Sequence, residues 1–273
     1  MDTQKTYTFK MTPQELLDYI DSGRLWPAPL SADLDIAAAY QLALAVRKLR
    51  IARGEVPKGY KIGFTNRNIW PRHQVFAPIW GTVWSTTLLF CDGEGDVSLA
   101  PSCQPRIEPE VVFGMKATPA LGASLEDLFN AVEWVAPGFE VVQSHLPDWK
   151  FKAADTVVDG ALHARLLVGT RVAVSGIAGN ATELDSLLAA TQVSLMTDGN
   201  VVDQGIGANV LDSPLRALHH FLTELRQCPS AADLLPGDVI TTGTLTDAWP
   251  VKPGKRWTGK FSTPLSTLTV NFQ

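Results

Sequence analysis

Three glutamates and a lysine are the residues of this sequence best suited to chemistry. Glu108 and Glu110 lie two positions apart in the mostly apolar stretch QPRIEPEVVFGM, residues 104–115, and Glu140 lies alone in APGFEVVQS. Residues two positions apart in a β-strand point to the same face of a sheet, so Glu108 and Glu110 are expected side by side. Because unpaired carboxylates in a half-buried strand are costly, a positive partner is expected near them.

A hard divalent cation is the partner that this ligand set favours. Three carboxylate oxygens suit Mg²⁺ or Mn²⁺, with water or substrate in the remaining positions. Pairs of the Glu–x–Glu type also arise by chance on solvated strands, so the prediction depends on the apolar residues that flank Glu108, Glu110 and Glu140. The three carboxylates and a dication would leave one negative charge, which nearby lysines could balance while still holding an anionic substrate.

Lys61, in the predicted strand YKIGFT, is the first candidate for such a lysine. Its stem could instead snorkel along a sheet edge; in the functional interpretation its ammonium group stabilises developing charge or transfers a proton. Thr244 follows a strand in GDVITTGTLT, residues 237–246, where hydroxyl and backbone N–H groups can bind a carboxylate. A tight turn would explain the adjacent Gly243 equally well.

Two other patterns predict weaker metal sites. CDGEGD presents Asp92, Glu94 and Asp96 at alternate positions, but it lacks the length and closing glutamate of an EF-hand loop, so a solvated loop is predicted. His219 and His220 are adjacent on a predicted helix and do not share a face. Glycine-rich nucleotide motifs and the nucleophile elbow of serine hydrolases are absent from the sequence, which removes the usual support for those functions.

Composition limits the class of protein. The 273 residues are 45% hydrophobic and 19% charged, with a net charge of −5, so no nucleic-acid partner is expected. No apolar run approaches the ~20 residues of a membrane span, and the first residues show no signal or transit pattern. The three cysteines are odd in number and widely spaced. These features predict reduced thiols in a cytoplasmic protein with no membrane partner.

The elements that must position these residues divide into a helical beginning and a β-rich remainder. TPQELLDYIDSG, residues 12–23, has a Thr–Pro start, a capping-box glutamate and a terminal glycine, which predict a helix. Residues 31–54 predict a second helix, capped by Ser31 or Asp33 and ended by Gly54.

From residue 60 the pattern becomes that of short, β-branched strands. The predicted strands lie within residues 60–65, 106–115, 138–144, 164–174, 191–205 and 266–272, and helices are predicted at 124–132 and 213–228. TDGN inside 191–205 predicts a hairpin. The pattern predicts an α+β fold, with a helical N-terminal segment, 1–60, and a β-rich catalytic domain, 61–273, that form one structural unit.

Four segments together resemble the fumarylacetoacetate hydrolase superfamily, and more narrowly its hydratase and decarboxylase branch. They are YKIGFTN, PRIEPEVVFG, PGFEVVQSHLPDWKFKAADTVVDGA and LLPGDVITTGTLT, and they occur in the family's order. The similarity extends from about residue 10 to the end of the chain. The ordered set is specific to the superfamily and much less specific to one reaction.

The resemblance implies a β-rich roll or distorted barrel with a small helical N-terminal segment. It also implies a homo-oligomer and a divalent metal held by three carboxylates. By motif, Glu108, Glu110 and Glu140 correspond to the metal ligands, and Lys61 corresponds to a catalytic lysine in a Lys–x–Gly strand.

Three further positions are assigned by the same resemblance. Lys152 and Asp155 match a Lys–x–x–Asp pair near the metal, with Lys152 catalytic and Asp155 substrate-binding, and Thr244 matches a substrate-binding Thr or Ser. The implied substrate is a small 2-hydroxy-2,4-dienoate or unsaturated 2-keto acid from aromatic-compound degradation. The implied reaction is hydration; decarboxylation of a 4-oxalocrotonate-like acid, C–C bond hydrolysis and ligand binding without turnover follow as alternatives.

Three residues depart from the pattern of the hydratases. Ile79 stands in PIWG where they carry an aspartate, and Gly160 and Leu162 stand in DGALH where they carry an asparagine and a serine. His163 is predicted as an alternative catalytic acid or base, although a buried, hydrogen-bonded structural histidine fits the sequence too. Hydration and decarboxylation share one metal-stabilised enolate, so the choice between them depends on proton-transfer groups, where the chain departs.

Overall fold

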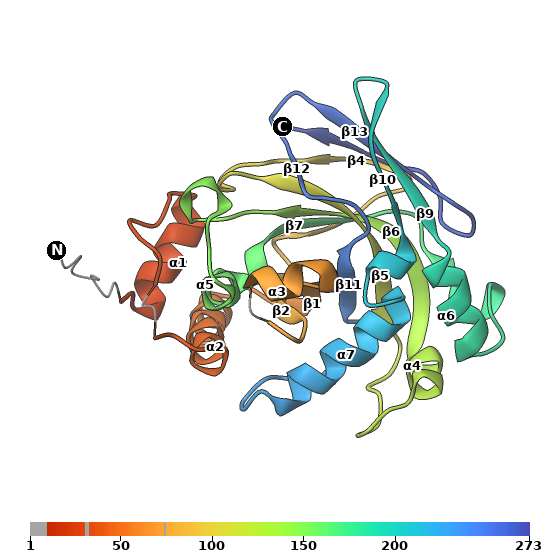
Figure 1. Ribbon diagram of the computed structural model, residues 1–273, viewed down its shortest axis with the longest axis horizontal. Helices are drawn as coiled ribbons and strands as arrows, with labels where there is room; N and C mark the ends of the chain where they lie inside the picture. Colours follow the sequence, from red (N-terminus) through yellow and green to blue (C-terminus); the bar gives the residue numbers. More distant parts are fainter. Residues whose placement is uncertain (1–9, 31–32, 74) are drawn as a thin grey trace.

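The chain folds into a curled β-sheet with a second, smaller sheet on one side and helices on the other (Figure 1). A computed structural model describes residues 10–30, 33–73 and 75–273. The α+β class and the β-rich, half-barrel architecture are confirmed. None of the helices in these ranges combines the length and the hydrophobicity that a membrane span needs.

Capping chemistry sets the ends of the two N-terminal helices. Helix α1, Pro13–Ser22, has the predicted reciprocal cap between Thr12 and Glu15 and ends at Gly23 in a left-handed conformation. Helix α2, Ile36–Ala52, is capped by Asp35, whose side chain accepts from the N–H of Ala38. The predicted cap at Asp33 is therefore wrong, and Ser31 lies outside the described residues. The other helices are α3 Trp70–His73, α4 Leu125–Ala131, α5 Ala153–Val158, α6 Ala181–Ala189 and α7 Pro214–Gln227.

The larger sheet contains the segments with the candidate residues. Its strands follow the order β2-β1-β11-β5-β6-β7-β3, with β8 and β12 beside β6 and β5. Their bounds are β1 Pro57–Gly63, β2 Ile79–Trp84, β3 Leu88–Phe90, β5 Arg106–Met115, β6 Val132–Val142, β7 His163–Val168, β8 Val172–Ala173, β11 Val239–Thr244 and β12 Trp249–Pro250. The predicted single run 164–174 is thus divided between β7 and β8.

The smaller sheet has the order β10-β9-β13-β14-β4. Its strands are β4 Glu94–Val97, β9 Gln192–Thr197, β10 Asn200–Ile206, β13 Arg256–Phe261 and β14 Leu268–Phe272. The TDGN hairpin is confirmed between β9 and β10. The solvated loop predicted for CDGEGD is partly wrong, because residues 94–97 pair with β14, while Glu94 forms an ion pair with Arg256 and Val97 is buried.

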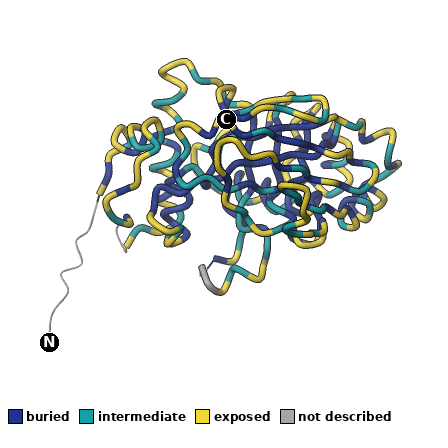
Figure 2. The backbone as a smooth tube through the Cα atoms, turned by 90° about the horizontal axis from the view of Figure 1, so that it is seen from above, coloured by how far each residue is buried: buried dark blue, intermediate teal, exposed yellow. Residues whose placement is uncertain are grey.

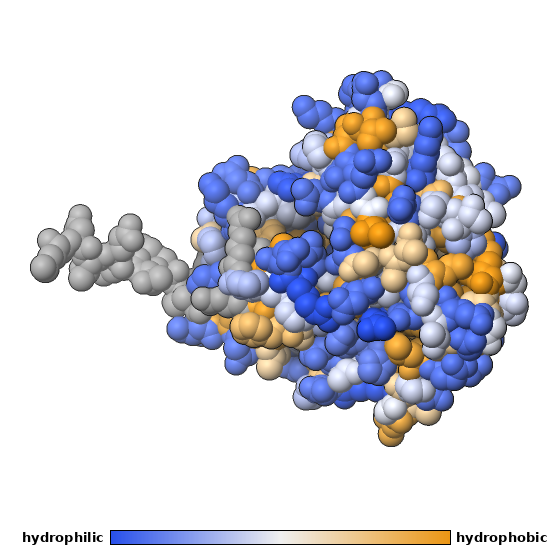
Figure 3. Space-filling model, turned by 45° about the vertical axis from the view of Figure 1, so that its right-hand side comes forward, coloured by the Kyte–Doolittle hydropathy of each residue, from blue (hydrophilic) through white to orange (hydrophobic). Residues whose placement is uncertain are grey.

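Apolar packing joins the helices to the larger sheet and the two sheets to each other. Tyr40 of α2 stacks on Trp80 of β2, with 4.5 Å between ring centroids. Phe139 of β6 belongs to a second cluster, which includes Leu195 and Trp257 of the smaller sheet. Figure 2 shows buried residues concentrated along the strands, and on the face in Figure 3 apolar residues form separate patches among polar ones. Strand β1 begins at Pro57, before the predicted division at residue 60, which stays a prediction.

Candidate metal centre

The register of β5 and β6 brings the three glutamates together. The strands pair antiparallel with Glu108 opposite Glu140, and Glu110 lies two residues further along the same face of β5. One carboxylate oxygen from each residue lies within 4.8 Å of the others. Within the described ranges, no other group of three or more acidic, histidine or cysteine side chains has this spacing.

The three buried or half-buried carboxylates of the cluster would be stabilised in their charged form by a cation. Glu110 and Glu140 are completely buried, and Glu108 is half-buried. Burial, opposed by Lys61 and reinforced by the neighbouring carboxylates, raises the pKa of Glu108 to about 8. Burial and Glu140 raise the pKa of Glu110 well above its ordinary value. A divalent ion would reverse these shifts, since it stabilises the charged form of every carboxylate around it.

One oxygen of Glu110 has the position that a metal ligand needs. Its Oε2 accepts hydrogen bonds from the hydroxyl of Thr241 and, at 2.5 Å, from the N–H of Gly243. Its Oε1 is buried without any hydrogen-bond partner. A buried acceptor without a partner costs about 1–3 kcal/mol, so a bound cation fits this oxygen. Gly243 is required here, because its φ is 102° and a Cβ would lie 2.0 Å from Oγ1 of Thr65.

Lys61 supplies the positive charge that the sequence predicts. It lies in β1, and its Nζ is 3.1 Å from Oε2 of Glu140. The side chain is 4% exposed. Burial lowers the pKa of this ammonium group, but the nearby carboxylates, Glu140 first, more than compensate, so the pKa is raised. Lys61 is therefore a buried cation held against the ligand set.

His163 orients one of the three glutamates. Its Nδ1 is 2.8 Å from Oε1 of Glu140, and its Nε2 is 2.8 Å from Oγ1 of Thr87. Burial and Lys61 lower the pKa of His163 well below 6.5, so the ring is neutral. A neutral ring that donates from Nδ1 to Glu140 accepts the Thr87 hydroxyl at Nε2, and this pair of bonds fixes the ring.

A cavity of about 170 Å³ adjoins the cluster. Lys61, Glu108 and Thr244 form a polar end, where substrate could meet the metal. The rest of the wall is mainly apolar and includes two of the three departures from the family pattern, Ile79 and Leu162. The apolar side chains are Ile62, Phe64, Ile69, Ile79, Val142, Trp149, Phe151, Ala161 and Leu162. A pocket with one charged end and apolar walls fits a small organic acid.

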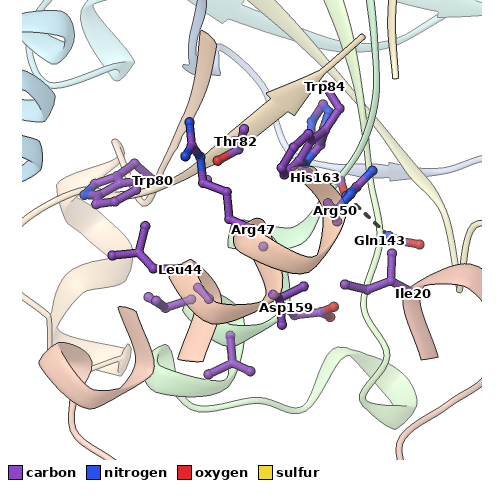
Figure 4. A pocket seen from close by; sticks show the side chains of 16 residues that line it. Ile20, Leu44, Arg47, Arg50, Trp80, Thr82, Trp84, Gln143, Asp159 and His163 are labelled. Carbon is purple, nitrogen blue, oxygen red and sulfur yellow. Dashed lines mark hydrogen bonds between the residues drawn. The ribbon is translucent and has the colours of Figure 1, made fainter. Parts of the chain in front are cut away.

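A second, smaller cavity lies on the other side of His163. It measures about 50 Å³, and His163, Arg47, Arg50 and Asp159 are among its lining residues (Figure 4). None of the three glutamates lines it. Its size admits only a few water molecules. His163 therefore separates this small chamber from Glu140 and does not line the larger cavity.

Lys152 and Asp155 do not line the larger cavity. The side chain of Lys152 is exposed at the start of α5, and its backbone N–H donates to Oδ2 of Asp155 at 2.9 Å. Oδ1 of Asp155 accepts from the N–H of Leu30 at 3.0 Å. Both oxygens of this buried carboxylate thus bind backbone, which ties α5 to the segment before α2. The roles predicted for these two residues stay predictions.

Two threonines that bind the cluster were not predicted. Thr241 lies in the quoted strand GDVITTGTLT, two residues before Gly243, and only its place on the same face as Gly243 could have identified it. Thr87 is 76 residues from His163 in the sequence, and no local pattern indicates their contact.

The fold resembles that of a putative fumarylacetoacetate hydrolase family protein from Yersinia pestis CO92, with a TM-score of 0.53 and 17% identity over 80% of this chain and 93% of the other. The chain resembles 4-oxalocrotonate decarboxylase from Pseudomonas putida G7, complexed with magnesium and adipate, with a TM-score of 0.80 and 27% identity over 97% of this chain and 99% of the other. No protein-family model matches the chain.

Curated relatives narrow the class. The chain is 31% identical to 2-hydroxyhexa-2,4-dienoate hydratase of Comamonas testosteroni, over 89% of this chain and 90% of that protein. It is 30% identical to a 4-oxalocrotonate decarboxylase of a Pseudomonas species, over 81% of this chain and 82% of that protein. The chain belongs to the family of 2-hydroxydienoate hydratases and 4-oxalocrotonate decarboxylases, which are lyases.

Proposed function

We propose that this protein is a divalent-metal-dependent hydratase that acts on a 2-hydroxy-2,4-dienoate, or the unsaturated 2-keto acid formed from it. The observation that carries the proposal is the convergence of Glu108, Glu110 and Glu140 beside a cavity with a mainly apolar wall. The hydratase name of a relative and the magnesium and adipate of a solved neighbour support it.

The three glutamates would hold Mg²⁺ or Mn²⁺, and the bound ion would supply Lewis acidity at the 2-oxygen of the substrate. Lys61 brings an ammonium group to the same end of the cavity. This charge offsets the negative charge that develops on the 2-oxygen as the dienol and keto forms interconvert. His163 holds the Glu140 carboxylate in place through its Nδ1–H.

Thr244 and the apolar wall position the substrate. The Thr244 hydroxyl oxygen accepts from the N–H of Thr246 at 3.2 Å, which leaves its hydrogen for a substrate carboxylate. Ile79, Phe151 and Leu162 exclude bulk water around the carbon chain of the substrate. A single water molecule would then add to the conjugated double bond of the unsaturated 2-keto form. This bond is already an activated acceptor, so no covalent enzyme intermediate is needed.

Decarboxylation of a 4-oxalocrotonate-like acid is the second candidate. Two observations favour it: the structural similarity to a decarboxylase covers nearly the whole chain, and polar residues of the hydratase pattern are replaced by Ile79 and Leu162. C–C bond hydrolysis and ligand binding without turnover rank below it, because neither has a specific feature in its favour.

A product assay by NMR in D₂O tests the proposed function. A panel of 2-hydroxy-2,4-dienoates and 4-oxalocrotonate is incubated with the protein and Mg²⁺, Mn²⁺ or a chelator. We expect a 4-hydroxy-2-keto acid that forms only with metal, and no carbon dioxide. Carbon dioxide from 4-oxalocrotonate would favour the second candidate, and turnover that is independent of metal would contradict both.

We also infer a homo-oligomer in the cytoplasm. The family resemblance supports an assembly, and the exposed apolar residues Leu89 and Phe90 on edge strand β3 offer a surface for it. The three cysteines form no disulfide, which supports a reducing compartment. Light scattering on the purified protein measures the assembly; a monomeric mass would contradict this inference.

A further inference from the structure

Thr87 lies where the larger sheet curls back on itself. It follows β2, which is at one end of the strand order, and directly precedes β3, which is at the other end. Its carbonyl accepts from the N–H of Leu166 on β7 at 2.8 Å, and its Oγ1 accepts from the N–H of Trp84 on β2 at 3.1 Å. The position of Thr87 is therefore fixed by backbone groups on both sides of this junction.

The Thr87 hydroxyl has two possible acceptors for its one hydrogen. Nε2 of His163 lies 2.8 Å from Oγ1, and the carbonyl oxygen of Trp84 lies 3.2 Å from it. On the other side of the ring, Nδ1 faces Oε1 of Glu140 at 2.8 Å. A proton on Nε2 would leave two lone pairs facing each other at that contact, so an ionised Glu140 requires the proton on Nδ1. Nε2 is then an acceptor, and the Thr87 hydroxyl donates to it.

The contact with His163 orients Glu140 without adding charge. Lys61 lies 3.1 Å from the other carboxylate oxygen, Oε2, but its positive charge competes with an ion. The neutral ring of His163 holds Oε1 and does not oppose a cation. The side chains of Glu140 and His163 are 0% and 3% exposed, so bulk water does not reach this contact. The orientation of the carboxylate therefore depends on the ring and on what fixes the ring.

We propose that Thr87 is a positioning residue of the metal centre: it sets the tautomer of His163 and thereby holds Glu140 in the orientation that binds the ion. The inference rests on the metal site of the proposed function and needs no particular substrate. Thr87 does not line the larger cavity, and it acts only through His163. A carboxylate that is already oriented loses less conformational freedom when it binds an ion, which raises the affinity.

Calorimetric Mn²⁺ titration of the full chain tests the proposal through a double-mutant cycle. Thr87→Val removes the hydroxyl, keeps the shape of the side chain and should weaken Mn²⁺ binding about 10–100-fold. Thr87→Ser keeps the hydroxyl and should bind Mn²⁺ like the wild type. In His163→Leu, which lacks the ring, the addition of Thr87→Val should cause no further loss, because Thr87 acts through that ring.

The ring of His163 gives a second readout that does not depend on affinity. With Mg²⁺ bound, NMR of the imidazole nitrogens should show a protonated Nδ1 and a bare Nε2 in the wild type. This preference should weaken in Thr87→Val, and His163→Leu identifies the signals by their disappearance. A wild-type ring that is protonated on Nε2 and bare on Nδ1 would overturn the proposal.

Thr156→Val is the matched control. Thr156 is completely buried, and its hydroxyl donates to the carbonyl of Ala153 at 2.7 Å within α5. Loss of this hydroxyl should lower stability and leave Mn²⁺ affinity unchanged. Wild-type affinity in Thr87→Val, or an equal loss in the His163→Leu background, would overturn the role of Thr87.

The same titrations separate this inference from the proposed function. Mn²⁺ binding without turnover of any dienoate would contradict the proposed function, and the double-mutant cycle would still decide the role of Thr87. A wild type that does not bind Mn²⁺ would overturn both.

Discussion

At the scale of single residues, the metal centre places opposite demands on each side chain. Glu110 must lose its hydration and still remain an anion, and Lys61 must stay charged without taking the place of the metal. Hydrogen bonds from Thr241 and Gly243 replace the lost hydration of one Glu110 oxygen, and the other oxygen stays available to the ion. The contribution of each side chain to stability and to metal binding therefore depends on whether an ion occupies the centre. Mutants measured with and without metal can separate these two contributions.

Glu110→Gln should abolish metal binding while the fold is kept. We expect at least a ~100-fold loss of Mn²⁺ affinity, since even outer partners of a ligand are worth about 10–100-fold. Without metal, the variant should be about as stable as the wild type, because burial and Glu140 already disfavour the charged form of Glu110 there. Calorimetric Mn²⁺ titration and melting in a chelator measure the two effects.

The control for this variant is Glu133→Gln, an exposed position on β6, the strand that carries Glu140. It should leave both Mn²⁺ affinity and melting temperature unchanged. Wild-type Mn²⁺ affinity in Glu110→Gln would remove this residue from the ligand set.

Lys61→Met should separate catalysis from metal binding. The loss of the ammonium group should lower kcat by about 10²–10⁴-fold, the range expected for a charged catalytic group. Mn²⁺ affinity should stay the same or increase, because a positive charge 3.1 Å from Glu140 competes with the ion. Steady-state kinetics and Mn²⁺ titration measure the two changes, and an unchanged kcat would leave Lys61 with a structural role only.

At the scale of elements, the centre depends on how strands meet and on how α5 is attached. The ladder between β5 and β6 sets Glu108 opposite Glu140 without help from either side chain. Helix α5 is anchored by Asp155, which accepts from backbone N–H groups of Leu30 and Lys152. This geometry gives Asp155 a structural role, and the substrate-binding role that the family resemblance implies stays a prediction.

Asp155→Asn should distinguish these two roles. An amide can accept from only one of the two N–H groups, so we expect a loss of about 1–3 kcal/mol in the free energy of unfolding and little change in KM. Urea denaturation and kinetics provide the measurements. Asp148→Asn, at an exposed ion pair with Lys150, is the control and should cost less than about 1 kcal/mol. A large rise in KM at wild-type stability would restore the substrate-binding role.

The sequence predicted elements where the signal is local. The cap of α1, the β9–β10 hairpin and the acidic pair on β5 each depend on residues a few positions apart. The sequence does not locate the cap of α2, because Ser31, Asp33 and Asp35 are all suitable N-cap residues. The position where the backbone enters the helix selects Asp35. Glu110 accepts a hydrogen bond from Thr241, which is 131 residues away in the sequence, and no local sequence pattern predicts that contact.

At the scale of the whole molecule, the helical N-terminal part and the β-rich part share one apolar core and several polar ties. Trp26 packs beside His145, with 6.0 Å between ring centroids, and the backbone N–H of Trp26 donates to the backbone carbonyl of His145 at 2.7 Å. Nδ1 of His145 lies 2.6 Å from Oδ1 of Asp159 at the end of α5. A titratable pair thus lies where the two parts meet.

The stability of this junction should decrease as pH rises. Burial lowers the pKa of His145, but the Asp159 carboxylate more than offsets it, so the pKa is raised above 6.5. A raised pKa in the folded state contributes stability in full below about 6.5, and this contribution is lost as pH rises through the folded-state pKa. The melting temperature of the wild type should therefore exceed that of His145→Gln most at about pH 6, and less at about pH 9.

Asp18→Asn, at an exposed position on α1, serves as a control with no pH-dependent difference from the wild type in this window. A gap between wild type and His145→Gln that widens with pH would mean that the neutral imidazole is the stabilising form.

The pairing of Glu108 with Glu140 also limits how this chain can change in length. Side chains alternate between the two faces of a strand, so one residue added or removed between Arg106 and Glu110 would turn the acidic groups to the opposite face. A substitution here alters one group, whereas a single insertion or deletion dismantles the whole ligand set. Natural or engineered variants that keep function should therefore tolerate length changes in the surface loops and almost none in this ten-residue strand.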